Sequence, residues 1–236
     1  MAKVDDHRAA LAALTDWMPY LDAHSGLPGP RGNLEFVAAC GEEASIVRAD
    51  QLIVTGDEFA TVCGLVAFGR HFGQGDDTHV AILHAKASDG RWRVREGVAM
   101  ALQRAGDDDL GRAFAIAERW ADDPDPLVRR AAVAAVCEPR LLRDPAFAGR
   151  ALAVLERVTA NLAASPVGDR RSPGVRTLRQ ALGYGWSVVI AALPVPGLTA
   201  FGLLEAEDDP DIVWIVRENR KKARLKRLLA DSGCDR

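Results

Sequence analysis

Arginine and tryptophan side chains recur at related places along the sequence, and both residue types can bind anions or flat rings. Trp92 and Trp214 each stand three residues before an arginine, Arg95 and Arg217. A guanidinium stacked on an indole can hold a charged or electron-poor ligand. The arginines that occupy such related places are Arg93, Arg95, Arg129, Arg130, Arg176, Arg179 and Arg217.

Two roles are open for these arginines. If the helices that carry them line one face, they form a basic stripe suited to phosphate or carboxylate groups. Alternatively, each arginine bonds an aspartate in a turn of its own or the neighbouring unit, and the bonds hold the helices together. Arg176 and Arg179 follow a turn with no aspartate beside it, SPGVRT. A free guanidinium would therefore be most informative at these two positions.

The tryptophans also allow two interpretations. Beside an arginine they can form a cleft for a flipped or damaged base. As large side chains with one polar atom, they can instead pack between neighbouring helices. The candidate residues for a concave binding face are Trp92, Arg95, Arg129, Arg179, Trp186, Trp214, Arg217 and Asn219.

The sequence predicts no catalytic set, no metal site and no cofactor. His79 and His84 are five residues apart, whereas a helical metal pair needs a spacing of four. No serine has the context of a nucleophile elbow, and the loop GQGDDTH lacks the lysine of a phosphate-binding loop. The four cysteines are widely separated, so neither a metal knuckle nor a disulfide framework is predicted.

The clearest local pattern is an acidic turn followed by an alanine-rich segment at residues 121–136, which read ADDPDPLVRRAAVAAV. Asp123 or Asp125 can accept hydrogen bonds from the first N–H groups of a helix, and Pro126 suits its first position. Apolar residues then recur every three or four positions, which predicts a helix with one small, apolar face. Small residues allow two helices to approach closely.

Similar segments recur along the chain, which indicates a repeated helical unit. From Val94 to Val128 the spacing is 34 residues, and from Leu178 to Val216 it is 38. The longer step of 50 residues between Val128 and Leu178 contains a loop rich in proline, glycine and serine at 161–174. Spacings near 35 to 40 residues are typical of repeats made of paired helices.

The DPDPLVRRAA motif, repeating with paired helices over about residues 57–229, resembles HEAT repeats, an α-solenoid class related to armadillo repeats. In that family the turn aspartate and the following Val-Arg open the second helix of each pair, which lines the concave side. The resemblance places Asp123, Val128 and Arg129 at these positions in the best unit. In the last unit the corresponding residues are Asp209, Val216 and Arg217.

The resemblance implies an all-α fold, a HEAT-like superhelix of about five helix pairs. We expect one solenoid domain over 1–236, with an N-terminal helical cap at 1–56, repeats at 57–229 and a tail at 230–236. In the cap, residues 5–22 are expected to form one amphipathic helix, and 46–55 a helix end plus turn. Asn33 and Asp57 are expected to cap the helices that follow them.

The charge distribution is uneven although the net charge is only −3. Residues 1–90 hold 6 basic and 13 acidic residues, whereas 214–236 hold 8 basic and 3 acidic. The last helix, near residues 216–229, can cap the solenoid with its polar side or touch an acidic partner. The overall acidity disfavours nucleic acid as a partner. No segment has the length of a signal peptide core or a membrane span, so a cytoplasmic location is expected.

These features favour a non-catalytic scaffold or adaptor whose concave groove binds a protein or peptide. The alternative is an enzyme. HEAT-like alkylpurine DNA glycosylases hold alkylated DNA with Trp, Asp and Arg at the centre of a concave solenoid, and Trp186, Trp214, Arg179, Arg217 and Asp125 are candidates for those roles. That alternative requires a locally basic face with two exposed indoles and a carboxylate.

Overall fold

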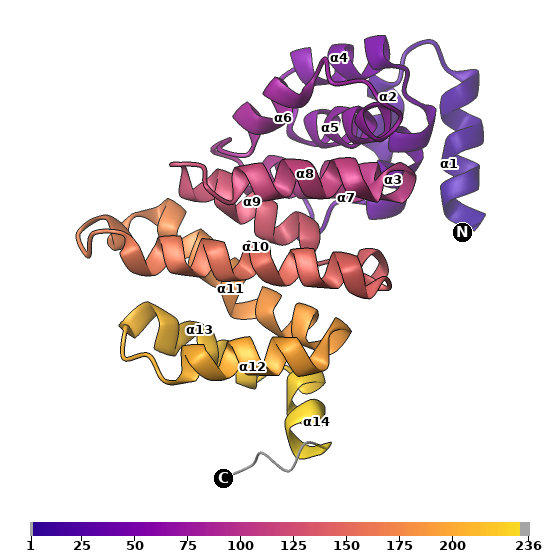
Figure 1. Cartoon of the computed structure of the whole chain (residues 1–236). Coiled ribbons are helices and arrows are strands. Elements are labelled where there is room, and N and C mark those ends of the chain that lie inside the picture. The colour runs from indigo at the N-terminus through magenta and orange to yellow at the C-terminus, as the bar shows by residue number, and fades with distance from the viewer. Residues whose placement is uncertain (1, 232–236) are drawn as a thin grey trace. The chain divides into compact units, whose positions relative to one another are not determined.

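The computed structural model describes residues 2–231, and within that range the chain contains helices and no strand. It forms two compact units, unit 1 (Met1–Ala113) and unit 2 (Phe114–Arg236). Figure 1 labels their helices. The helices of the first unit, with α8 crossing into the second, are α1 (Ala2–Ala13), α2 (Met18–His24), α3 (Leu34–Glu43), α4 (Ile46–Val54), α5 (Glu58–Gly73), α6 (Val80–Lys86), α7 (Trp92–Asp108) and α8 (Leu110–Trp120). Those of the second are α9 (Pro126–Val136), α10 (Pro145–Ala164), α11 (Pro173–Ala192), α12 (Pro194–Glu205), α13 (Pro210–Arg220) and α14 (Ala223–Asp231), with 3-10 turns at Pro139–Leu142 and Asp169–Arg171.

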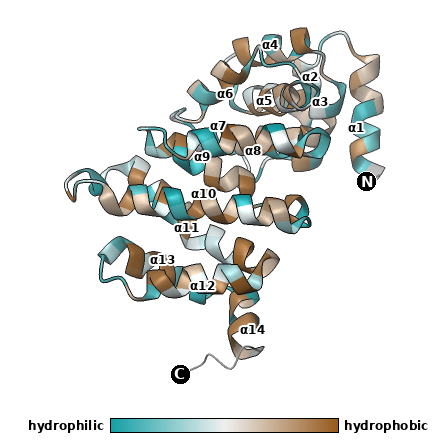
Figure 2. Ribbon diagram, viewed as in Figure 1, coloured by the Kyte–Doolittle hydropathy of each residue, from teal (hydrophilic) through white to brown (hydrophobic). Residues whose placement is uncertain are grey.

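Successive helices pair along the chain, as the sequence predicts. Helix α4 packs on α5, α6 on α7, α10 on α11 and α12 on α13, and α8 and α9 follow one another between the second and third of these pairs. The predicted all-α, HEAT-like arrangement of about five helix pairs is confirmed. In Figure 2 the helices of both units carry apolar and polar segments side by side, as amphipathic helices do.

Unit 1 is built around α5, which contacts α3, α4 and α7. Two glycines of α5 face the backbone of α7. A Cβ added to Gly69 would lie 2.0 Å from the carbonyl oxygen of Ala101, and one added to Gly73 would lie 2.7 Å from that of Ala105. Only glycine permits this separation, so the pairs Gly69–Ala101 and Gly73–Ala105 set how closely α5 and α7 pack.

The front of unit 1 differs from the prediction in two places. The expected single helix at 5–22 is two helices, because Pro19 has no N–H and fits only the first turn of α2. Trp17 at the break is buried and donates from Nε1 to the carbonyl oxygen of Leu11. The expected helix end at 46–55 is the complete helix α4, capped by Ser45.

In unit 2, α11 is the central helix and lies between α9 and α13, with α10 and α12 packed against this row (Figure 1). The core of unit 2 includes Trp186, which has no exposed surface and donates from Nε1 to Thr159 Oγ1 at 3.1 Å. Helix α14 buries Leu225 against α11 and α13 and exposes Lys226 and Arg227. Helix α14 therefore packs its apolar side on unit 2, as expected of a cap.

Side-chain caps set the register of the units. Asn33, Asp57, Asp125 and Asp209 each accept a hydrogen bond from an N–H in the first turn of the following helix, which confirms the expected caps at Asn33 and Asp57. In α5, α7, α9, α11 and α13, which are the second helices of the pairs, the third residue of the helix is buried. These residues are Ala60, Val94, Val128, Val175 and Ile212.

This register corrects the alignment of the last units. Ile212, not Val216, is the counterpart of Val128, and Arg217 lies one helical turn beyond the counterpart of Arg129. In α11 the counterpart of Arg129 is Arg176. Capping residues give the register more reliably than Val-Arg pairs because the cap marks where the helix begins.

Candidate functional site

An arginine-lined pocket lies in unit 2 where the loop before α11 meets the start of α13. Its volume is about 280 Å³. The pocket combines four guanidiniums and two carboxylates with two apolar residues. Its lining residues are Val167, Arg170, Arg171, Arg176, Arg179, Asp209, Pro210 and Asp211. We call this the arginine pocket.

One side of the arginine pocket is a network of paired charges. Arg170 donates to Asp209 Oδ2 at 2.5 Å and lies 3.6 Å from Asp211 Oδ2. Arg179 donates to the other oxygen of Asp211 at 2.5 Å. Asp211 is only 8% exposed, and it therefore joins two arginines from different segments through a buried carboxylate. Charge-assisted bonds of this kind are strong and directional.

The same network fixes the loop before α11. Arg170 also donates to the backbone carbonyls of Ser165, at 2.9 Å, and Ala163. Hydrogen bonding to Asp209 raises the pKa of Arg170. Burial raises the pKa of Asp209, but hydrogen bonds from Arg170 and from backbone N–H groups outweigh this effect and lower it. The charges of this network are therefore held in place and internally balanced.

The other side of the arginine pocket is unpaired. Within residues 2–231, the guanidiniums of Arg171 and Arg176 are exposed and have neither an ion pair nor a hydrogen bond. The four arginines and two aspartates leave the pocket a formal charge of +2. Arg176 therefore has the free guanidinium that the sequence indicated for one of these two positions. Arg179 instead pairs with Asp211 of α13.

Trp214 borders this network. The guanidinium of Arg179 lies 4.7 Å from the centre of its ring, which is within cation–π range. A Cβ on Gly183 of α11 would come within 2.8 Å of the indole. Trp214 is thus held against α11 on one side and remains half-exposed.

A larger groove of about 620 Å³ lies between α12, α13 and the start of α14. Its apolar lining includes Val213, which is 49% exposed on α13. Around these side chains the groove is mixed in charge. The lining residues are Leu204, Glu205, Glu207, Val213, Val216, Arg217, Arg220, Lys221 and Lys226. We call this the α12–α13 groove.

Some charges of the α12–α13 groove are already paired. Arg220 donates to Glu205 at 2.7 Å, and Lys221 to Glu218 at 2.6 Å. Arg217 is mostly exposed and lies 3.5 Å from Glu218, and the side chain of Lys226 is exposed. The groove therefore presents apolar surface beside cations that water now solvates.

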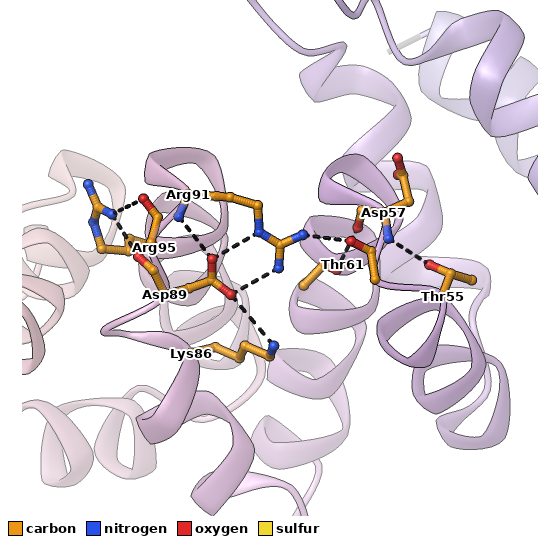
Figure 3. Close-up of polar contacts among 9 residues, drawn as sticks. Thr55, Asp57, Thr61, Lys86, Asp89, Arg91 and Arg95 are labelled. Carbon is orange, nitrogen blue, oxygen red and sulfur yellow. Dashed lines mark hydrogen bonds and ion pairs between the residues drawn. The ribbon is translucent and has the colours of Figure 1, made fainter.

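In unit 1, polar contacts join two loops (Figure 3). Arg91 makes two bonds of 2.9 Å to the carboxylate of Asp89 and a third, of 2.7 Å, to the carbonyl of Gly56. Lys86 lies 3.6 Å from the same carboxylate. The hydrogen bond from Arg91 holds the pKa of Asp89 far below its usual value, although burial acts in the opposite direction. This cluster fastens the loop before α5 to the loop before α7.

The predicted Trp–Arg pairs are rearranged. Arg95 donates to the carbonyls of Asp89 and Gly90, at 2.7 and 3.1 Å, and belongs to the loop cluster of Figure 3. The guanidinium over Trp92 is that of Arg93, at 4.6 Å from the ring centre. Likewise, the partner of Trp214 is Arg179 rather than Arg217. The side chains of Trp92 and Arg217 are more than half exposed.

Arg129 is buried, with 8% of its surface exposed, and its Nε has no hydrogen-bond partner within residues 2–231. Burial lowers its pKa, and the charges of Asp123 and Asp125 offset part of that effect. Arg129 is therefore near the turn aspartates, as an internal ladder requires, and it offers little surface to a ligand.

Two predicted contact residues are wrong, because they have no exposed surface. Trp186 lies in the core of unit 2. Asn219 accepts from the N–H of Ser187 at 2.9 Å and donates to the carbonyls of Leu182 and Ile215 at 2.9 and 2.8 Å. Its polar atoms bond helix backbones, so its role is to join α13 to α11.

Sequence reasoning missed part of both sites. Arg170 and Arg171 belong to the loop rich in proline, glycine and serine, for which no binding role was predicted, although the DRR run at 169–171 is a visible signal. Asp211 was overlooked because Asp209 matches the repeat motif better. Val213 gave no signal, since a valine in an apolar helix is most often buried.

Residues 2–231 contain no group of three or more His, Cys, Asp or Glu side chains placed to hold a metal ion. Cys40, Cys63 and Cys137 are free and buried, and burial raises the pKa of Cys137 to about 12. None of the described helices combines the length and apolar character that crossing a membrane requires.

The family comparison supports the repeat pattern directly. Residues 58–137 match the family model of HEAT repeats. The matched stretch begins with the first residue of α5 and ends just after α9. No curated protein and no solved structure matches the chain. The match shows that residues 58–137 carry HEAT repeats, and the paired helices of the structure agree with it.

Proposed function

We propose that this HEAT-repeat protein is a non-catalytic binding module, and that the α12–α13 groove takes an acidic peptide segment of a protein partner. The observation that carries the proposal is the exposure of Val213 on the lining of a groove of about 620 Å³ beside the exposed side chains of Arg217 and Lys226. An exposed apolar lining with a polar rim is typical of interaction sites.

The chemistry of the partner follows from that lining. One or two apolar side chains would cover Val213 and Val216, which would remove apolar surface from water. Carboxylates would pair with Arg217 and Lys226 at the edge. The segment 214–236 holds 8 basic and 3 acidic residues, so an acidic segment is favoured over a basic one.

A displayed peptide library tests the proposal. We expect selection on the full-length protein to enrich peptides with an apolar residue flanked by Asp or Glu. Val213→Asp should weaken binding of the enriched peptides at least tenfold, because it places a carboxylate in the apolar lining. Val195→Asp is the matched control, since Val195 is an exposed valine of α12 outside the groove.

The proposal fails if no peptide family is enriched, or if Val213→Asp and Val195→Asp bind the enriched peptides as the unchanged protein does. The affinity for the peptide should also fall moderately as salt is raised, because salt screens the charge pairs at the edge of the groove. The apolar contact with Val213 is not screened in this way.

The damaged-DNA alternative has one favourable observation, since Arg179, Asp211 and Trp214 lie together. The damaged-DNA alternative also requires two exposed indoles on one face. Within the described part of unit 2, Trp120 and Trp186 are buried and only Trp214 is half-exposed. Asp211, moreover, is bonded to two arginines, which leaves its carboxylate poorly placed to act on a ligand.

Fluorescence anisotropy with labelled duplex DNA, unmodified or carrying an alkylated or abasic site, tests this alternative. We expect no preference for the damaged duplex. Tight, salt-sensitive binding that prefers the damaged duplex and is lost in Trp214→Ala would replace the peptide proposal with the DNA-repair one.

A further inference from the structure

We propose that the arginine pocket binds a phosphate monoester group of a small molecule. This site is separate from the α12–α13 groove: the two share no lining residue. The inference rests on how the pocket distributes its charges and not on the number of arginines alone.

The paired half of the arginine pocket provides a fixed frame. Arg170 is bonded to Asp209 and to two backbone carbonyls, and only 11% of its side chain is exposed. Asp211 bonds both Arg170 and Arg179. Because these bonds fix the end of α10 and the loop at 165–172 to the start of α13, the positions next to Arg170 are held without help from a ligand.

The unpaired half provides the charge. Arg171 directly follows Arg170, and Arg176 lies in the first turn of α11. Both guanidiniums are exposed and, within residues 2–231, have no acidic partner. Two arginines with free donor groups beside this fixed frame are suited to bidentate recognition of phosphate or carboxylate.

The net charge of the arginine pocket favours a phosphate monoester over a carboxylate or a phosphodiester. The four arginines and two aspartates leave +2, which a phosphate monoester matches with about −1.5 to −2 at pH 7. A carboxylate or a backbone phosphodiester carries only −1. Asp209 and Asp211 also act against long polyanions, since a second phosphate near them would be repelled. The pocket of about 280 Å³ is large enough for one such group with part of its ester substituent.

The test is isothermal titration of the full-length protein with phenyl phosphate, with diphenyl phosphate as the singly charged diester and benzoate as the carboxylate. We expect phenyl phosphate to bind at least tenfold more tightly than either. Its affinity should also rise from pH 5 to pH 7.5, as the second ionisation of the monoester, with pKa near 6, is completed.

Arg171→Gln and Arg176→Gln should each lower the affinity for phenyl phosphate about tenfold, since each removes a charge-assisted bond. Neither arginine has an internal partner, so both variants should keep the thermal midpoint of the unchanged protein. Arg143→Gln is the matched control, because Arg143 is an exposed arginine of unit 2 outside the pocket and its replacement should not change the affinity.

Three results would overturn the inference. The first is no heat with phenyl phosphate up to about 10 mM, a concentration that would detect even a weak, millimolar site. The others are equal affinity for the monoester and the diester, and a loss of affinity in Arg143→Gln as large as in Arg171→Gln or Arg176→Gln. A phosphoserine peptide and a short DNA duplex serve as further probes. A peptide that binds more tightly than phenyl phosphate, with the same dependence on Arg171 and Arg176, would keep the phosphate site but assign it to a protein. Tight binding of the duplex that is lost in Arg171→Gln and Arg176→Gln would reject the assignment to a small molecule.

Discussion

The carboxamide oxygen of Asn219 in α13 accepts a 2.9 Å hydrogen bond from the backbone N–H of Ser187 in the middle of α11. The amide nitrogen of Asn219 donates to the carbonyls of Leu182 and Ile215. Both polar atoms of the Asn219 side chain therefore have hydrogen-bond partners inside the protein. Neither Asn219 nor Ser187 has exposed surface. One side chain thus joins the backbone of α11, which lines the arginine pocket, to that of α13, which lines both sites of unit 2.

Replacing Asn219 with leucine should lower the free energy of unfolding by about 2 kcal/mol, because buried backbone groups lose their partner. Urea unfolding followed by circular dichroism measures the change. Gln180→Leu serves as the control, since Gln180 is an exposed residue of α11. If both variants unfold at the same urea concentration as the unchanged protein, the buried bonds contribute little.

Two glycine-to-alanine substitutions should have opposite effects. Gly69→Ala places a Cβ 2.0 Å from the carbonyl oxygen of Ala101, which forces α5 and α7 apart and should cost about 3 kcal/mol. Gly149 lies within α10 with open space around it, so Gly149→Ala should stabilise the protein by about 0.5–1 kcal/mol. Thermal and urea unfolding of both variants give the comparison, and a tolerated Gly69→Ala would show that the two helices can separate freely.

The Asp89–Arg91 contact should make stability depend on pH in the acid range. Since folding lowers the pKa of Asp89, its contribution is fully present above the unfolded-state pKa of about 4 and is lost as pH falls towards the folded-state value. Asp89→Asn should therefore be less stable than the unchanged protein at pH 7, and the difference should shrink below about pH 4. Thermal midpoints from pH 2.5 to 7 measure this, with Asp208→Asn, an exposed position, as the control. A difference that is constant over the whole pH range would contradict it.

The Arg179–Asp211 ion pair should show coupling in a double-mutant cycle. We expect Arg179→Met and Asp211→Asn each to destabilise unit 2, and the double variant to be more stable than the sum of the two predicts. The coupling should be about 1–2 kcal/mol, because the pair is largely but not fully buried. Additive effects, measured by urea unfolding, would mean that Arg170 alone holds Asp211.

The repeated architecture could be predicted because its signals are local. A capping aspartate, a proline in the first turn and a 3.6-residue apolar period each act within a few residues, as Asp125 and Pro126 show. The break before α2 was predictable too, since Pro19 excludes a continuous helix, but the apolar period around it masked the signal.

The sites could not be predicted to the same degree because their contacts cross between helices. Spacing along one helix suggested that Arg217 stacks on Trp214, yet the guanidinium that does so belongs to Arg179 of α11. Trp186 and Asn219 were wrongly placed at the surface for the same reason. Which side of a helix is covered depends on its neighbours on both sides, and a sequence pattern records only that one side is apolar.

The arginine pocket and the α12–α13 groove share helix α13. Asp211 lines one and Arg217 the other, six residues apart, or about 9 Å along the axis. Because both sites use this one helix, a movement of α13 on binding at one site would also move lining residues of the other. Thermodynamic reciprocity then requires that any factor by which phosphate changes the affinity for the peptide equals the factor by which the peptide changes the affinity for phosphate.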